Sequence, residues 1–428
     1  MPGAPRGGPA AYLVAAVAGC LVGLVGASFR WCLVRVQELH VSLLSATERL
    51  AGPGWLIPVL TTAAGATVAC ALARRVPLAA GSGIQDVEAV WRGEREPRPL
   101  LWLLPAKFVG GVIAMGSGLV LGREGPTVHM GAAIGAEAGR LARMSPRDVT
   151  VLHTSLAGAG LAVAFTAPLS GVVFVCEEVA KAVEARVVLL TLIGTATAVG
   201  CSELIVGDRP VFRVPATLAD PPLALLPAVL LFGAATAVLG VAYSRLIVGF
   251  LDLADRATRV GPVARAALIG AVVGLLLGID PLLAGGGDEL SGRLLGGDMP
   301  VGSVLAGYFA VRFLAGPLSY SAGTPGGLFA PLLALGALWG ALVHGLALPL
   351  LPGDGSGAVP FAIVGMAALF AAVVRAPVTG ITLVVEMTGT TSLLVPLLAA
   401  CFAATLTADR MGSPPVYDSL RLRMAKSS

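Results

Sequence analysis

Arg123 and Glu124 stand between two apolar runs and are the first candidates for chemistry in this sequence. The runs 108–121 and 127–136 contain no Asp, Glu, Lys or Arg, and an ionisable side chain inside a membrane segment is costly and usually functional. The motif 122–126, Gly-Arg-Glu-Gly-Pro, predicts a chain break followed by a helix with its proline in the first turn. The free N–H groups of such a helix end attract anions. The alternative is that Arg123 and Glu124 neutralise each other in a loop beside the lipid headgroups.

Two more glycine-rich breaks occupy residues 81–84 and 323–331, and each precedes an apolar helix without placing a basic side chain deep in it. This pattern suits a permeant anion, because N–H dipoles and hydroxyls can replace its hydration, whereas a buried lysine would hold it too tightly. Ser82 and Tyr417 are candidate hydroxyl donors. A helix-capping serine and an interfacial tyrosine remain the alternatives for each residue taken singly.

Two adjacent carboxylates, Glu177 and Glu178, end an apolar helix. Neighbouring side chains on a helix point about 100° apart, so the two cannot share one role. Glu177 has a counterpart, Glu386, in an internal repeat of the chain, which indicates a structural position at a helix end. Glu178 has no counterpart and is the better functional candidate. The alternative is that both carboxylates are solvated at the cytoplasmic surface.

The composition is that of a polytopic membrane protein, and it excludes several other classes. Of 428 residues, 56% are hydrophobic and 13% are charged, and the mean hydropathy is +0.87, as expected when each helical span needs about 20 apolar residues. The net charge of +4 argues against a nucleic-acid partner. The six cysteines form no CxxC pair and the four histidines show no ligand spacing, so we expect neither a metal nor a cofactor. Hydrolase, zincin and P-loop motifs are absent from the sequence, so we expect no enzyme.

Two patterns recur in the same order in each half of the chain. Residues 167–177 and 376–386 both read A-P-x-x-G-x-x-x-V-x-E, and 122–126 resembles 327–331 as G-x-E/F-x-P. Duplicated halves with interrupted helices predict a transporter whose substrate lies between the repeats near the membrane midplane. These matches alone do not decide whether the halves are inverted. The predicted units are an N-terminal repeat, a connector and a C-terminal repeat, at residues 1–208, 209–222 and 223–428.

Taken together, these motifs resemble those of the CLC family of chloride channels and chloride/proton antiporters, whose filter motifs read GSGIP, GREGP and GxFxP. The resemblance implies an all-α membrane fold of two inverted-topology repeats with broken and re-entrant helices. It also implies a homodimer with one pore in each subunit. Gln85 replaces the proline of the first motif, which removes a restraint on φ and adds an amide near the filter. The residues that match the filter motifs are Gly81, Gly83, Ile84, Gly122, Arg123, Pro126, Gly327 and Pro331.

The resemblance also implies roles for individual residues. Glu124 becomes the outer gating glutamate, which occupies an anion site when ionised and swings away when protonated. Glu178 becomes the inner proton-transfer glutamate, a feature of the antiporter branch. The implied chloride-binding residues are Ser82, Tyr417, Gly125, Leu328 and Phe329.

We therefore expect a secondary active transporter that exchanges chloride for protons. The alternative is a passive, voltage- or pH-gated chloride channel on the same fold. The expected partners are the lipid bilayer, chloride, protons and a second copy of the chain. The expected location is a bacterial inner membrane, with the basic C-terminal tail (Arg421, Arg423 and Lys426) in the cytoplasm.

Overall fold

The computed structural model describes most of the chain, and the regular structure of the described part is helical. The predicted connector 209–222 lies largely outside the described residues, so its position as a boundary stays a prediction. The described ranges are 9–47, 54–98, 100–207, 211–215, 225–298, 302–347 and 357–427.

Within these ranges, seven helices are long and apolar enough to cross a membrane. A helix of about 20 residues spans about 30 Å, which matches the hydrocarbon thickness of a bilayer. The prediction of a polytopic all-α membrane protein is therefore confirmed. The seven helices are α1 (Pro9–Thr47), α2 (Leu56–Arg75), α6 (Pro146–Phe165), α8 (Ala185–Val206), α9 (Leu226–Arg256), α10 (Pro262–Ile279) and α13 (Phe329–Ala347).

The remaining described helices have at most 18 residues, and several cannot cross a bilayer alone. Interrupted backbone is tolerated at membrane depth only where it is buried in protein or lines a cavity, and the helix that starts at Glu124 is indeed buried over its first thirteen residues. The longer members of this group are α4 (Leu100–Gly116), α5 (Glu124–Leu141), α12 (Ser303–Tyr320), α14 (Ala358–Val374) and α16 (Leu394–Arg410). The shortest are α3 (Ile84–Trp91), α7 (Pro168–Phe174) with the π-helical turn η2 (Val175–Val179), α11 (Asp288–Leu295), α15 (Pro377–Thr388) and α17 (Val416–Ser427).

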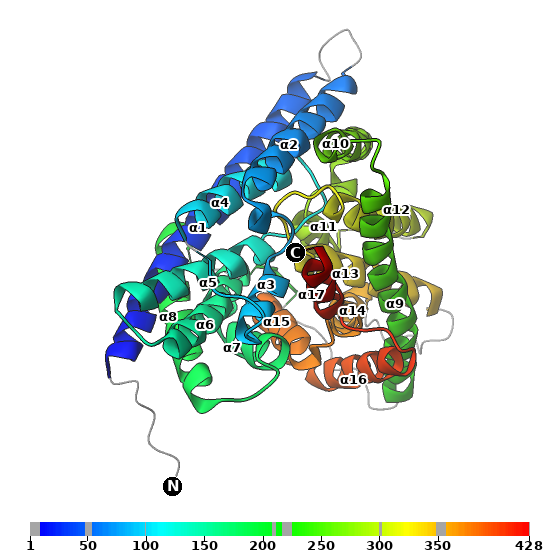
Figure 1. Ribbon diagram of the computed structural model, residues 1–428. Coiled ribbons are helices and arrows are strands. Elements are labelled where there is room, and N and C mark those ends of the chain that lie inside the picture. The colour runs from blue at the N-terminus through cyan, green and yellow to red at the C-terminus, as the bar shows by residue number, and fades with distance from the viewer. Residues whose placement is uncertain are drawn as a thin grey trace.

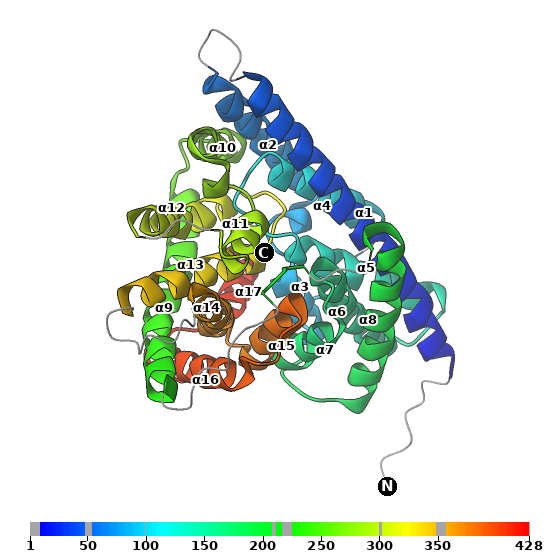
Figure 2. The same cartoon turned by 180° about the vertical axis from the view of Figure 1, so that it is seen from behind.

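Helix packing repeats between the two halves. Helix α5 packs on α6 as α13 packs on α14, and α1 packs on α8 as α9 packs on α16. Figure 1 shows α1 and α4–α8 on one side of the molecule and α9, α12–α14 and α16 on the other, and the reverse view in Figure 2 agrees. The short helices α3, α15 and α17 lie near the seam between these groups, where α3 packs on α17 and α7 on α15.

Across this seam, Glu177 of the first repeat caps α15 of the second, and Glu386 of the second repeat caps α7 of the first. Glu177 accepts hydrogen bonds from the main-chain N–H of Thr379, at 2.7 Å, and of its neighbour in the first turn of α15. Glu386 does the same for Ser170, also at 2.7 Å, and its neighbour in the first turn of α7. Carboxylates satisfy the free N–H groups of a helix N-terminus in this way. The predicted structural position of Glu177 is thus observed.

Close helix contacts through glycine give a test of this packing. An added Cβ at Gly336 in α13 would overlap the main-chain oxygen of Gly365 in α14, whereas nothing lies within 4 Å of a Cβ at Gly345 on the same helix. We expect Gly336→Ala to lower the free energy of unfolding by about 1–3 kcal/mol through overpacking. Gly345→Ala should leave the thermal midpoint of the purified protein unchanged or slightly higher, because alanine favours helix. Equal midpoints for the two variants would contradict the close packing of α13 against α14.

Candidate anion and proton sites

Main-chain hydrogen bonds join the three glycine-rich breaks. The N–H of Gly122 donates to the oxygen of Gly327 at 2.9 Å, and the N–H of Gly327 donates back at 2.7 Å. The N–H of Gly81 donates to the oxygen of Thr324 at 3.0 Å. Breaks that lie more than 200 residues apart in the sequence therefore meet at one point, where the helices α3, α5 and α13 begin.

The carboxyl group of Glu124 lies at this junction, fully buried. Its Oε1 accepts a hydrogen bond from the main-chain N–H of Phe329 at 2.6 Å, and its Oε2 has no hydrogen-bond partner among the described residues. A Cβ at Gly122 or Gly327 would overlap the carboxyl oxygens. Glycine is needed at both positions so that the backbone can approach the carboxylate.

Arg123 points away from its neighbour. Its Nη1 pairs with Asp288 at 2.9 Å and its Nε donates to the main-chain oxygen of Ala164 at 2.9 Å. The alternative in which Arg123 and Glu124 simply neutralise each other is therefore wrong. The direct donor to Glu124 is the N–H at the start of α13, as the anion-attracting role of a helix N-terminus predicts.

Ser82, just before α3, and Tyr417, on α17, converge on the same junction. Both are fully buried, the Tyr417 hydroxyl lies near the Ser82 side chain, and neither hydroxyl oxygen has a hydrogen-bond partner among the described residues. A Cβ at Gly125 would overlap Ser82 Oγ. The ring of Tyr417 stands edge-on to that of Phe329, with centroids 5.7 Å apart. Buried hydroxyls without partners are rare, and these two can donate to an anion held beside Glu124.

The remaining motif residues lie at or beside the starts of α3, α5 and α13. Pro126 and Pro331 occupy the first turns of α5 and α13, and Leu328, fully buried, directly precedes α13. Gly83 is the residue before α3 and has φ +92°, which glycine adopts without strain. Ile84, also fully buried, begins the same helix.

The side chain of Gln85 contacts the backbone just before α3. Its Oε1 accepts a hydrogen bond from the N–H of Gly83 at 3.2 Å, and the hydroxyl of Tyr320 accepts one from the N–H of Ser82 at 3.3 Å. Gln85 and Tyr320 also line a cavity of about 1940 Å³ that reaches Gly81. Tyr320 was not predicted, because a single tyrosine in an apolar run carries no distinguishing signal.

Lys107 was not predicted either. It is fully buried on α4, and its Nζ donates to the main-chain oxygen of Gly81 at 2.8 Å. The helices that follow the breaks carry no buried lysine or arginine, as the sequence indicates, although α5 carries the buried His129. Lys107 reaches the first break from another helix. A lone lysine in the apolar run 100–121 was the signal that could have found it.

Glu178 lies in the π-helical turn η2 and is 2% exposed. Its Oε1 has no hydrogen-bond partner among the described residues. The alternative in which both glutamates are solvated is therefore wrong, since Glu178 is buried and Glu177 caps α15. Turns of this type are frequent at functional sites. The charged side chains that act on Glu178 are those of Lys181, Glu88, Asp418 and Glu177.

Joined helix breaks, paired halves and a buried carboxylate at a helix N-terminus define a polytopic membrane transporter built from repeats. A family model described as "Voltage gated chloride channel" matches residues 64–409. An H(+)/Cl(-) exchange transporter ClcA from Citrobacter koseri is 38% identical over 97% of this chain and 88% of its own length. A ClcA from Salmonella typhi is 37% identical with the same coverage. The chain belongs to the CLC family of voltage gated chloride channels and their transporter relatives.

Solved structures are similar over nearly the whole chain. A slow cyanobacterial Cl-/H+ antiporter superposes with a TM-score of 0.92 at 30% identity, covering 97% of this chain and 98% of that one. A CLC-type fluoride/proton antiporter superposes with a TM-score of 0.78 at 22% identity, covering 93% and 94%. The first shows close structural kinship, and the second shows the fold alone. The predicted CLC fold is confirmed.

The hydrogen bonds of Tyr320 and Gln85 generate a prediction for anion binding. Tyr320→Phe removes the acceptor that occupies the Ser82 N–H, so we expect that N–H to become free for an anion. One hydrogen bond is worth about 0.5–1.5 kcal/mol, which corresponds to roughly two- to tenfold tighter chloride binding. Calorimetric titration of the purified protein with chloride measures this change.

Tyr243→Phe is the matched control, because Tyr243 is also fully buried but lies on α9. Its substitution should leave the chloride dissociation constant unchanged. If Tyr320→Phe weakens binding, or behaves like the control, the Tyr320 hydroxyl does not compete with the anion.

Proposed function

We propose that this protein exchanges chloride for protons across a membrane. The observation that carries the proposal is the hydrogen bond from the N–H of Phe329 to Oε1 of Glu124, at 2.6 Å. A carboxylate thereby occupies a helix N-terminus of the kind that binds anions. The names of the relatives, an H(+)/Cl(-) exchange transporter and a Cl-/H+ antiporter, support exchange over the passive channel that remains the alternative.

Coupling follows from competition for this position. Chloride can take the Phe329 N–H only when the Glu124 carboxylate leaves, and the carboxylate leaves most readily when it takes up a proton and loses its charge. Each ion then binds at the expense of the other form, which gives a coupling free energy between the two sites. The Ser82 and Tyr417 hydroxyls would hold the anion as it passes, with the amides of Gly125 and Leu328.

Glu178 would deliver protons to this gate from the inner side. It is buried without a full set of hydrogen bonds, so it can exist in either protonation state without breaking a helix cap, unlike Glu177. The exchange needs only chloride and protons as transported ions, with no cofactor or metal.

The membrane location and the oligomeric state of the protein form part of the same proposal. We place it in a bacterial inner membrane as a homodimer with one pore in each subunit, built from repeats 1–208 and 223–428. Basic residues concentrate around the large cavity, which supports a cytoplasmic position for that side and for the C-terminus, because cytoplasmic segments are enriched in Lys and Arg. These residues are Arg75, Arg95, Arg98, Arg256, Arg423 and Lys426.

Proton uptake by liposomes containing the purified protein tests the exchange. An outward chloride gradient should drive protons inward until the two gradients balance, whereas a membrane voltage that follows chloride and ignores pH would establish the channel. Glu178→Gln should abolish proton uptake while chloride flux continues, since glutamine cannot carry the proton.

Glu177→Gln provides the control at the neighbouring position. The single amide oxygen can still accept from one of the two main-chain N–H groups that cap α15, so the cap is weakened but proton uptake should persist. Proton transport that survives in Glu178→Gln but fails in Glu177→Gln would transfer the inner role to Glu177.

A further inference from the structure

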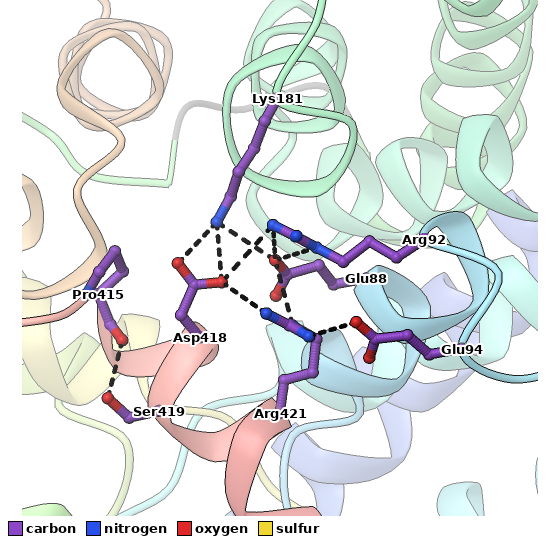
Figure 3. A network of polar contacts seen from close by, with 8 residues as sticks. All are labelled: Glu88, Arg92, Glu94, Lys181, Pro415, Asp418, Ser419 and Arg421. Atoms are coloured by element: carbon purple, nitrogen blue, oxygen red, sulfur yellow. Dashed lines mark hydrogen bonds and ion pairs between the residues drawn. The ribbon is translucent and has the colours of Figure 1, made fainter. Parts of the chain in front are cut away.

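Lys181 reaches into a charged network whose middle is formed by the carboxylates of Glu88 and Asp418 (Figure 3). Its Nζ pairs with both carboxyl oxygens of Asp418, at 2.9 and 2.8 Å, and with Oε1 of Glu88 at 3.2 Å. The same oxygen of Glu88 is 3.0 Å from Arg92 Nη2 and 3.5 Å from Arg421 Nε. One ammonium group therefore bridges carboxylates on α3 and α17.

The three members of this bridge are close in sequence to three transport residues. Glu88 lies on α3, which begins beside Ser82. Asp418 directly follows Tyr417 on α17, and Lys181 follows Glu178 by less than one helical turn. The contacts that fix Lys181 therefore also fix the short segments that carry both buried hydroxyls and the inner glutamate.

The backbone of Lys181 indicates that its side chain matters. Its φ is +52°, a left-handed conformation that is uncommon for residues other than glycine. Glycine would adopt this conformation without strain, but it would remove one of the three cations that Glu88 and Asp418 share, the other two being the guanidinium groups of Arg92 and Arg421. Lys181 therefore combines a strained backbone conformation with ion pairs to Glu88 and Asp418.

The bridge matters energetically because Glu88 is both charged and buried. Glu88 is 1% exposed, so it depends on its cations for compensation. Burial raises the pKa of its carboxyl group, and the neighbouring Asp418 raises it further, while Lys181 opposes both. The charged groups that face Lys181 are Glu88 and Arg92 from α3, Asp418 and Arg421 from α17, and Glu178 from its own segment.

We propose that Lys181 is a positioning residue for the coupled exchange, which clamps α17 to α3 and supplies the counter-charge for Glu178. This inference deepens the proposed function and rests on it. The clamp holds the Tyr417 hydroxyl near Ser82, so that chloride passes only in step with the outer carboxylate. Lys181, three residues further along the chain, is a cation that acts on the Glu178 carboxyl group.

Without this clamp, we expect chloride to cross the membrane without the coupled movement of protons. In Lys181→Met we expect at least a twofold rise in the number of chloride ions moved per proton. We also expect the pH profile of proton uptake to shift to higher pH, because Glu178 loses a cation that favours its charged form. Lys181→Arg keeps the charge and should restore both the ratio and the profile.

Two further variants separate positioning from general stability. Lys181→Gly removes the backbone strain together with the side chain, so it should fold better than Lys181→Met and still lose coupling. Arg143→Met is the matched control, since Arg143 is another basic residue with a positive φ, +53°, and is exposed after α5. It should transport like the wild type.

All five proteins, the wild type included, are measured in the same vesicles for chloride flux, proton flux and pH dependence. Wild-type vesicles without chloride-driven proton uptake would refute the exchange itself. Wild-type uptake with an unchanged ratio and pH profile in Lys181→Met and Lys181→Gly would overturn the role of Lys181 alone. Failure of Lys181→Arg to restore coupling would show that the charge is not the relevant property.

Discussion

The contact between the Glu124 carboxylate and the N–H of Phe329 is the interaction on which the rest of the structure depends. A carboxylate is buried there against one main-chain donor, with its second oxygen unpaired among the described residues. Burial of a charge with so few partners is costly, so the position is suited to exchange between a side-chain anion and a dissolved one. The absence of side chains at Gly122 and Gly327 allows the backbone to come this close to the carboxyl group.

Duplication explains how such a site is assembled. Each half supplies a helix that begins at a glycine break, and the hydrogen bonds between Gly122 and Gly327 bring the two helix starts together. The reciprocal caps of Glu177 and Glu386 fix the same seam at the starts of α15 and α7. Helices too short to cross a bilayer become useful in this arrangement, because their ends meet inside the protein.

The sequence predicted those parts of the fold and site that leave local patterns. Apolar runs predicted the helices, glycine–proline motifs predicted the breaks, and the repeat predicted the structural position of Glu177. It could not predict partners that the fold brings together from distant segments without a local pattern. Three hydrogen-bonded pairs belong to this group: Lys107 with Gly81, Tyr320 with Ser82, and Lys181 with Asp418. Each pair is joined only by tertiary packing.

A bromide-difference map of Glu124→Gln tests the central competition most directly. The neutral amide competes weakly for the Phe329 N–H, so crystals grown in bromide should show an anomalous peak within hydrogen-bonding distance of that nitrogen. The wild type at high pH should show the carboxylate there and a weaker peak. Bromide bound along Ser82 and Tyr417 in both proteins, with none at the Phe329 N–H in either, would contradict the account.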